Sequence, residues 1–240
     1  MNRTLLYLHL GLGDHLLFNG LVRAYAKKYQ AIGIFCKSHN LESVRFMFHD
    51  LPKVRVIEVQ KGDISARRFI AINRILNRMS LGVLGFSDVF IFGFQFLDRS
   101  SPEPFDRQIY ALANLSPKEK YEKFFVQRNY ARERALFNEM YPGSEYIFLH
   151  EDVSRGYVID RTKIHSRLPI VSSAEHRTDN IFDYGTILDK AKEIHTIDSS
   201  FLSLVDLLPN STTNRQIYLH RYARTDGWTP SLRKDWIIIE

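Results

Sequence analysis

Short apolar segments alternate with segments whose apolar residues recur at helical spacing, and this alternation limits the folds open to the chain. Two parallel strands cannot be joined by a tight turn, so a helix normally fills each crossover. The pattern therefore predicts parallel sheet covered by helices. In the first half, the expected strands are residues 4–10, 31–36, 54–59 and 88–92, and the expected helices are 15–29, 41–48 and 67–79.

A second alternation follows the proline- and glycine-containing breaks at residues 102–104 and 142–143. We therefore predict an α/β protein with two Rossmann-like α/β/α lobes, residues 1–125 and 126–240, that face a central cleft. The expected helices are 105–114, 130–141, 182–192 and 201–208, and the expected strands are 146–150, 168–172, 193–197 and 216–220.

The balance of charge favours anionic ligands. The net charge of +6 suits phosphates or nucleic acid, but no contiguous basic block is present, so a small phosphorylated ligand is the better match. A single cysteine, Cys36, fits a reducing compartment. Asp14 and His15 interrupt the early apolar run, which argues against a signal peptide, and no segment reaches the roughly 20 apolar residues of a membrane span. We expect a cytoplasmic protein.

The segment Gly11-Leu12-Gly13-Asp14 follows the first expected strand and precedes a helix. Glycines allow positive φ and close approach of a ligand to the backbone, and a helix start favours anions. A dinucleotide fingerprint would need a third glycine where this chain has Leu16. Asp14 is therefore either a helix cap or a group that takes part in chemistry.

Two segments of the second lobe end expected strands with polar residues. His150 closes one strand, and Ser154-Arg155-Gly156 follows it; Arg155 could hold a phosphate or simply pair with Glu151 or Asp152. Asp198-Ser199-Ser200 precedes an apolar helix, where hydroxyls and free N–H groups suit a phosphate or a plain helix cap.

Several motifs are missing from the sequence. It contains no Asp-x-Asp pair for a metal–diphosphate complex, no nucleoside-triphosphate loop and no Gly-x-Ser-x-Gly elbow, and one cysteine cannot build a structural zinc site. We expect no bound metal. The alternating aromatic residues Phe90, Phe92, Phe94 and Phe96 are interpreted as core or inter-lobe packing rather than a base-stacking surface.

The stretch "LGLGDHLLFNGLVRAYAKKY" resembles the amino-terminal motif of heptosyltransferase-like glycosyltransferases of the GT-B fold, and "IDSSFLSLVD" is similar to their second-lobe helix start. "PFDRQIYALANL" and "FLHEDVSRGYVID" are similar to segments of small viral and bacterial glycosyltransferase-like proteins. The chain is shorter than typical members, and Asn19-Gly20 replaces the usual proline of the first helix.

This resemblance implies transfer of a sugar from a nucleotide-sugar donor, bound by the second lobe, to a hydroxyl of a carbohydrate acceptor, bound by the first. Asp14 would be the general base of an inverting, metal-independent reaction with no cofactor, in the cytoplasm (the host cytoplasm for a viral protein). The alternative is a non-catalytic nucleotide- or glycan-binding protein of the same fold. The oligomeric state is not predicted. The acceptor-binding candidates are His15 and Asn19, and the donor-binding candidates are Gly11, Gly13, His150, Ser154, Arg155, Asp183, Asp198, Ser199, Ser200, Phe201 and Arg221.

Overall fold

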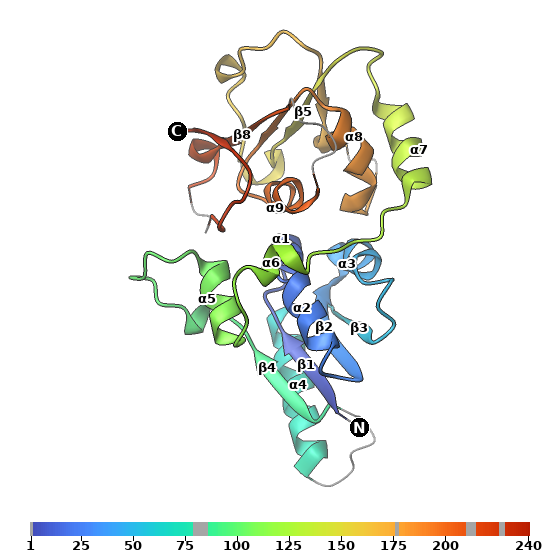
Figure 1. Cartoon of the computed structure of the whole chain (residues 1–240), viewed down its shortest axis with the longest axis vertical. Coiled ribbons are helices and arrows are strands. Elements are labelled where there is room, and N and C mark those ends of the chain that lie inside the picture. Colours follow the sequence, from blue (N-terminus) through green and yellow to red (C-terminus); the bar gives the residue numbers. More distant parts are fainter. Residues whose placement is uncertain (1, 79–85, 176–177, 210–214, 226–228) are drawn as a thin grey trace. The chain divides into compact units, whose positions relative to one another are not determined.

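Two α/β units make up the chain, Met1–Gln127 and Arg128–Glu240 (Figure 1). The computed structural model describes residues 2–78, 86–175, 178–209, 215–225 and 229–240. Each unit contains its own parallel sheet, so the predicted fold class of two Rossmann-like α/β units is confirmed. The expected boundary, between residues 125 and 126, falls two residues before the division at Gln127.

The first unit is built on a parallel sheet with the strand order β3-β2-β1-β4, which places β1 in the interior. Its strands are β1 (Arg3–Tyr7), β2 (Ala31–Lys37), β3 (Val54–Val59) and β4 (Asp88–Ile91), and its helices are α1 (Leu12–Leu17), α2 (Asn19–Ala26), α3 (Leu41–Met47), α4 (Asp63–Arg78), α5 (Phe105–Leu112) and α6 (Glu119–Glu122).

Successive side chains of β1 point to opposite faces of the sheet, so both faces of the sheet contribute to the core of this unit. Leu5 and Tyr7 belong to the core that the buried face of α4 completes through Ala66 and Ile70. On the other face, the Tyr25 ring of α2 packs edge-on against Phe90 of β4, with ring centroids 5.2 Å apart. Figure 1 shows α2 and α4 on opposite sides of the sheet.

The second unit has the strand order β6-β5-β7-β8-β9, and every neighbouring pair is parallel. Short 3-10 helices follow several of these strands and carry candidate residues of the site. The strands are β5 (Ile147–His150), β6 (Ile170–Ser172), β7 (Glu193–Thr196), β8 (Gln216–His220) and β9 (Ile237–Ile239), and the helices are α7 (Tyr130–Met140), α8 (Gly185–Lys190) and α9 (Ser200–Leu207).

An ionic cluster fixes α7 against α8. Arg128, just before α7, pairs with Glu133 of that helix, and its Nη1 donates to Asp189 Oδ2 of α8 at 2.6 Å. Gly185 opens α8 next to this cluster; a Cβ there would stand 2.6 Å from Glu133 Oε2. A side chain at this position would therefore displace the ends of the Glu133 and Arg128 side chains from this arrangement.

Some predicted elements differ from the structure. The helix expected over 15–29 begins earlier, at Leu12, and is broken at Phe18 into α1 and α2. The helix expected over 182–192 is a 3-10 turn, Ile181–Tyr184, followed by α8. Strand β9 was not predicted, and the residue expected to end the helix 67–79, Met79, lies outside the described residues.

The strand-like aromatic run also ends early. β4 stops at Ile91, and Phe94–Phe96 is a 3-10 helix. Phe92 is buried and stacks on Phe90, and Phe94 packs on Phe105, with ring centroids 6.2 and 5.3 Å apart. Phe96 is 54% exposed and so is not part of the core of its unit.

A buried histidine pair in the second unit makes its stability depend on pH. His195 Nδ1 lies 2.8 Å from His220 Nε2, and Glu193 Oε2 lies 3.2 Å from His195 Nε2. Burial, with the neighbouring His195, lowers the pKa of His220 to about 4. The unfolded chain therefore binds the proton first as the pH falls below about 6.5, and stability is lost between pH 6.5 and 4.

We expect the protonation of His220 in the unfolded chain to lower the unfolding free energy by about 2 kcal/mol between pH 6.5 and 5. Urea unfolding at several pH values measures this slope. In the variant His220→Gln, the slope of the unfolding free energy against pH should correspond to about one proton fewer taken up on unfolding. The variant His165→Gln, at an exposed histidine, should leave this slope unchanged. Equal slopes in His220→Gln and the parent chain would show that His220 does not titrate in this way.

Candidate functional site

The start of α1 places a carboxylate at the carboxyl end of β1. Gly11 holds the N-cap position with φ −73° and ψ 147°, and Asp14 is the third residue of the helix. A Cβ on Gly11 would stand 2.7 Å from Asp14 Oδ2, so the carboxylate folds back over the helix start. The N-cap interpretation of Asp14 is therefore wrong: Gly11 is the N-cap, and Asp14 adds negative charge in the first turn, where the helix dipole favours it.

The two glycines that precede Asp14 have ordinary backbone conformations. Gly11 is extended, Gly13 is helical, and the described glycines with positive φ are Gly62, Gly143 and Gly156. Neither Gly11 nor Gly13 uses the positive φ that a glycine allows. What Gly11 supplies is the space that the Asp14 carboxylate occupies.

The predicted acceptor-binding residues are both buried. His15 is 1% exposed, burial lowers its pKa to about 4, and neither ring nitrogen has a partner among the described residues. Asn19 is fully buried; its Nδ2 donates to the Phe125 carbonyl at 3.2 Å, and its Oδ1 accepts from Phe125 N at 3.1 Å and from Arg23 Nε at 3.0 Å. These bonds attach the segment after α6 to α2, so the amide has a structural use.

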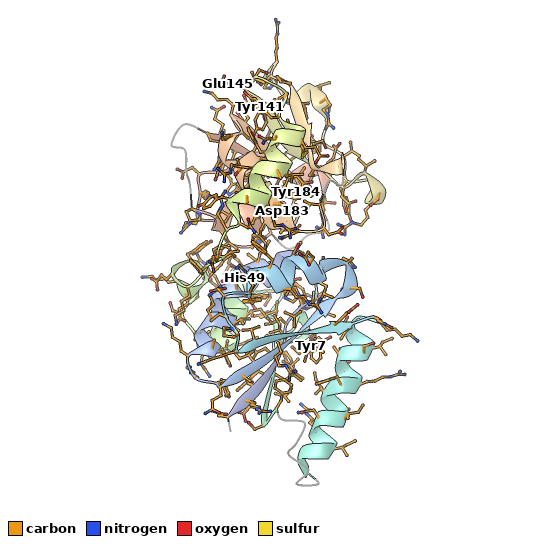
Figure 2. The ribbon with its side chains drawn as sticks, turned by 90° about the vertical axis from the view of Figure 1, so that its right-hand side faces the viewer. Tyr7, His49, Tyr141, Glu145, Asp183 and Tyr184 are labelled. Atoms are coloured by element: carbon orange, nitrogen blue, oxygen red, sulfur yellow. The ribbon has the colours of Figure 1, made fainter. Side chains whose placement is uncertain are left out.

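Sequence reasoning missed a cavity on the α4 side of the first sheet, at the carboxyl ends of β1 and β4 (Figure 2 labels Tyr7). Its volume is about 420 Å³, and a smaller hollow of about 50 Å³ adjoins it through the shared residues Tyr7, Arg67 and Gln95. The larger cavity is lined by Tyr7, Arg67, Ile70, Ala71, Arg74, Ile91 and Gln95, and His9 and Asp63 line the smaller one.

Polar groups are held in place around this cavity. Tyr7 Oη donates to Asp63 Oδ1 at 2.5 Å, and burial together with that carboxylate raises the pKa of Tyr7 to about 12. His9 Nε2 accepts from Phe94 N at 3.1 Å, and burial lowers the pKa of His9. The phenol and the imidazole are therefore neutral hydrogen-bonding groups near pH 7. The sequence offered one signal for this site, polar residues at the end of an apolar strand.

In the second unit, parallel pairing brings the ends of β5 and β7 together, since His150 is in register with Thr196. The segments that follow these strands, Val153–Arg155 and Ser199–Ser200, thus leave the same edge of the sheet. His150 Nδ1 lies 2.6 Å from Ser173 Oγ, its ring packs on Phe201, and burial lowers its pKa to about 4. It is a neutral imidazole at pH 7.

The loop after β5 is held by ion pairs. Arg155 Nε donates to Asp152 Oδ2 at 2.6 Å, and Ser154 Oγ donates to Asp152 Oδ1, also at 2.6 Å. Glu151 pairs with Arg161 instead, at 2.6 Å. Of the two pairings considered for Arg155, the structure has the one with Asp152. The Arg155 side chain remains 57% exposed, and this contact uses its Nε.

The start of α9 is capped by Ser199, whose Oγ accepts from Phe201 N at 3.2 Å. Asp198 is engaged elsewhere, since its Oδ2 accepts from Thr229 Oγ1 and its carbonyl accepts from Arg224 Nη1. Ser200 is the first residue of α9. The Phe201 ring is buried against Phe148 and Tyr184, so it belongs to the core.

The remaining two candidates are tied to other parts of their unit. Asp183, beside Tyr184 in Figure 2, is buried and accepts from Arg132 through both carboxylate oxygens, at 2.9 and 2.8 Å. Thr178 Oγ1 donates to Asp183 Oδ2 at 2.6 Å. Arg221 pairs with Glu240 at 3.0 Å and is about half exposed. Asp183 anchors α7, and its partners account for both of its oxygens.

The described parts of the chain form neither a cluster of metal ligands nor a helix suited to cross a membrane. Within them, no three His, Cys, Asp or Glu side chains converge on a point where a metal ion could be held. No helix of the described residues combines the length and the apolar character that crossing a bilayer requires. The single cysteine, Cys36, is buried in β2, and burial raises the pKa of its thiol to about 12.

Two α/β units with parallel sheets agree with the fold that the resemblance to GT-B proteins predicts. The chain is similar in fold to the glycosyl transferase family 9 protein of Veillonella parvula, with a TM-score of 0.56 and 10% identity over 99% of this chain and 86% of that one. At this identity the likeness defines the fold alone.

Two weaker likenesses were found, both with TM-scores below 0.5. One is to the iron-containing dodecameric glycosyltransferase TibC of enterotoxigenic E. coli, with 8% identity, a TM-score of 0.46 and coverage of 91% of this chain and 57% of that chain. The other is to the E. coli heptosyltransferase WaaC with ADP, with 16% identity, a TM-score of 0.38 and coverage of 90% and 86%. No protein-family model and no curated protein sequence matches the chain.

Proposed function

We propose that this protein is a glycosyltransferase that moves a sugar from a nucleotide-sugar donor to a hydroxyl group of a carbohydrate acceptor. The observation that carries the proposal is the likeness, over 99% of this chain, to the fold of a glycosyl transferase family 9 protein. The position of Asp14 supports it, because the carboxylate stands at the carboxyl end of an interior parallel strand, where ligands of such sheets bind.

Asp14 is proposed as the general base. As the acceptor oxygen attacks the anomeric carbon, its O–H bond breaks and the proton passes to the Asp14 carboxylate. The bond from the anomeric carbon to the nucleoside diphosphate breaks at the same time, and the diphosphate leaves with the electron pair. A single displacement of this kind inverts the anomeric configuration.

The acceptor is proposed to bind in the cavity of the first unit. Tyr7, Gln95 and Arg67 offer hydrogen-bonding groups suited to sugar hydroxyls, and Ile70 and Ile91 offer apolar surface for the faces of a sugar ring. Asp14 belongs to the helix that comes after β1, and residues at the carboxyl end of β1 line the cavity. His15 and Asn19, which are buried and structurally engaged, would then support the site rather than contact the acceptor.

The donor is proposed to bind at the edge where β5 and β7 end. The start of α9 offers the backbone N–H of Ser200 and the helix dipole to a diphosphate. Arg155 would add positive charge through its terminal nitrogens while Asp152 holds its Nε. These groups would stabilise the leaving diphosphate without a metal ion. A nucleotide-sugar donor and one reduced cysteine fit a cytoplasmic enzyme.

A panel of nucleotide sugars, each offered with mixed hydroxyl acceptors, tests this proposal through the release of nucleoside diphosphate. We expect release from one donor class, and the variant Arg155→Ala should raise the donor KM about tenfold through loss of a charged contact. Arg167→Ala, at an exposed arginine of the same unit, is the matched control and should leave KM unchanged.

The same panel separates the proposal from its alternative. Tight binding of a nucleotide or a glycan without turnover of any donor would identify a non-catalytic binding protein of this fold. Arg155→Ala would weaken nucleotide binding in that case as well, so turnover is the deciding measurement.

A further inference from the structure

Helix α4 exposes more apolar surface than its position on the sheet explains. Ile64, Ile72 and Ile75 are 58%, 57% and 56% exposed, which is unusual for three large aliphatic side chains of one helix. α4 is also the longest helix of the described chain, with 16 residues. Other exposed apolar residues are spread over several elements, among them Leu112 of α5 and Val153 after β5.

The three isoleucines share one side of the helix. At 100° per residue, Ile64, Ile72 and Ile75 fall within an arc of about 80°. The opposite side carries the buried Ala66, Ile70 and Asn73; Asn73 Nδ2 donates to the Phe86 carbonyl at 3.0 Å. The inner face of α4 is thus fully used by the core, and the outer isoleucines form a separate surface, which we call the isoleucine face. Figure 2 shows side chains of α4 projecting away from the sheet.

The charges next to the isoleucine face have one sign. The sequence of α4 contains four arginines and one acidic residue, Asp63. Arg68 is exposed and falls between the isoleucines on the helix wheel, at about 40° from Ile64. Arg67 and Arg74 lie on the border of the face, beside the cavity that they line. Long arginine side chains can hold their guanidinium groups in water while their stems lie along apolar surface.

We propose that the isoleucine face of α4 binds the surface of an anionic lipid membrane, with the helix lying in the plane of the headgroups. Apolar side chains flanked by arginines are what such an interfacial helix requires. At 1.5 Å per residue the helix is about 24 Å long, too short to span the roughly 30 Å hydrocarbon core, so it would lie along the surface.

Charge favours a membrane over a second copy of the chain. Pairing two α4 helices through their isoleucine faces would bring like-charged arginines together, whereas anionic lipid headgroups attract them. Each arginine near an anionic surface strengthens binding by about fivefold. This inference does not depend on the proposed function, because membrane binding requires no turnover.

Sedimentation of the full chain with phosphatidylcholine vesicles, with and without 30 mol% phosphatidylglycerol, tests the proposal. We expect binding to the anionic vesicles that weakens at high salt, and much weaker binding to the neutral ones. Ile72→Glu/Ile75→Glu should reduce the partition coefficient more than tenfold, and Arg68→Gln about fivefold. The matched control Val153→Glu/Val158→Glu replaces two exposed apolar residues of the second unit and should bind as the parent does.

A tryptophan at the isoleucine face gives a direct readout. Ile72→Trp should show a blue shift of fluorescence, relative to the parent, when anionic vesicles are added. Because the substituted residues are exposed, circular dichroism should show folded variants. The proposal is overturned if anionic vesicles do not bind the chain, or if binding persists in Ile72→Glu/Ile75→Glu. It is also overturned if the parent chain is a dimer in the absence of vesicles and the only effect of these substitutions is to make it a monomer.

Discussion

Replacing Asp14 by asparagine is expected to lower kcat for sugar transfer by about 10²- to 10⁴-fold while the donor KM stays within about twofold. Asparagine has nearly the same shape, so it keeps the space left by Gly11 filled, but it cannot accept a proton at neutral pH. The measurement is steady-state release of nucleoside diphosphate from the donor identified in the panel.

The control for this variant must separate chemistry from helix stability. Glu42 is an exposed carboxylate in the first turn of α3, in the same unit, so Glu42→Gln removes a comparable helix-dipole interaction. Both variants should lose about 0.3–1 kcal/mol of stability, and only Asp14→Asn should lose turnover. If Asp14→Asn turned over donor at the rate of the parent chain, the carboxylate would serve the start of α1 alone.

Local sequence patterns were enough to predict most strands and the position of the Gly11–Asp14 segment. β3, for example, covers the predicted residues 54–59, because a segment rich in β-branched residues needs no distant partner to be recognised. The helix start at Ser199 was also predictable, since a hydroxyl before an apolar helix is a capping signal. The predicted fold class followed from the order of such segments.

The parts that sequence could not reveal depend on distant contacts. The break at Phe18 accompanies the buried amide of Asn19, which bonds to Phe125, 106 residues away. The Tyr7–Asp63 hydrogen bond joins residues 56 positions apart, and it exists only because α4 packs on the end of β1. Asp183 looked like a ligand-binding residue, but its partner Arg132 comes from a different helix.

A buried ion pair of the first unit should have the largest single effect on stability. Lys120 Nζ of α6 lies 2.8 Å from Asp106 Oδ2 of α5, and both side chains are 1% exposed. α6 is also held against α2, since a Cβ on Gly20 would stand 2.3 Å from the Glu119 carbonyl oxygen. With its backbone held in this way, α6 has little freedom to move Lys120 into water.

Lys120→Met is therefore expected to cost about 3–5 kcal/mol, because it leaves the Asp106 carboxylate buried without its cation. Lys118→Met, at an exposed lysine just before α6, should stay within about 0.5 kcal/mol of the parent. Urea unfolding followed by far-UV circular dichroism measures the loss. Both tryptophans of the chain, at positions 228 and 236, belong to the second unit, so their fluorescence serves as an internal reference.

The double variant Lys120→Met/Asp106→Leu distinguishes an ion pair from simple packing. Replacing both members of a buried pair by apolar residues removes the uncompensated charge, so the double variant should recover at least half of the stability that Lys120→Met loses. If only packing were lost, the losses of stability caused by the two substitutions would add, and the double variant would be less stable than Lys120→Met. A loss below about 1 kcal/mol in Lys120→Met would contradict the prediction, because the buried Asp106 carboxylate would then not depend on the Lys120 ammonium.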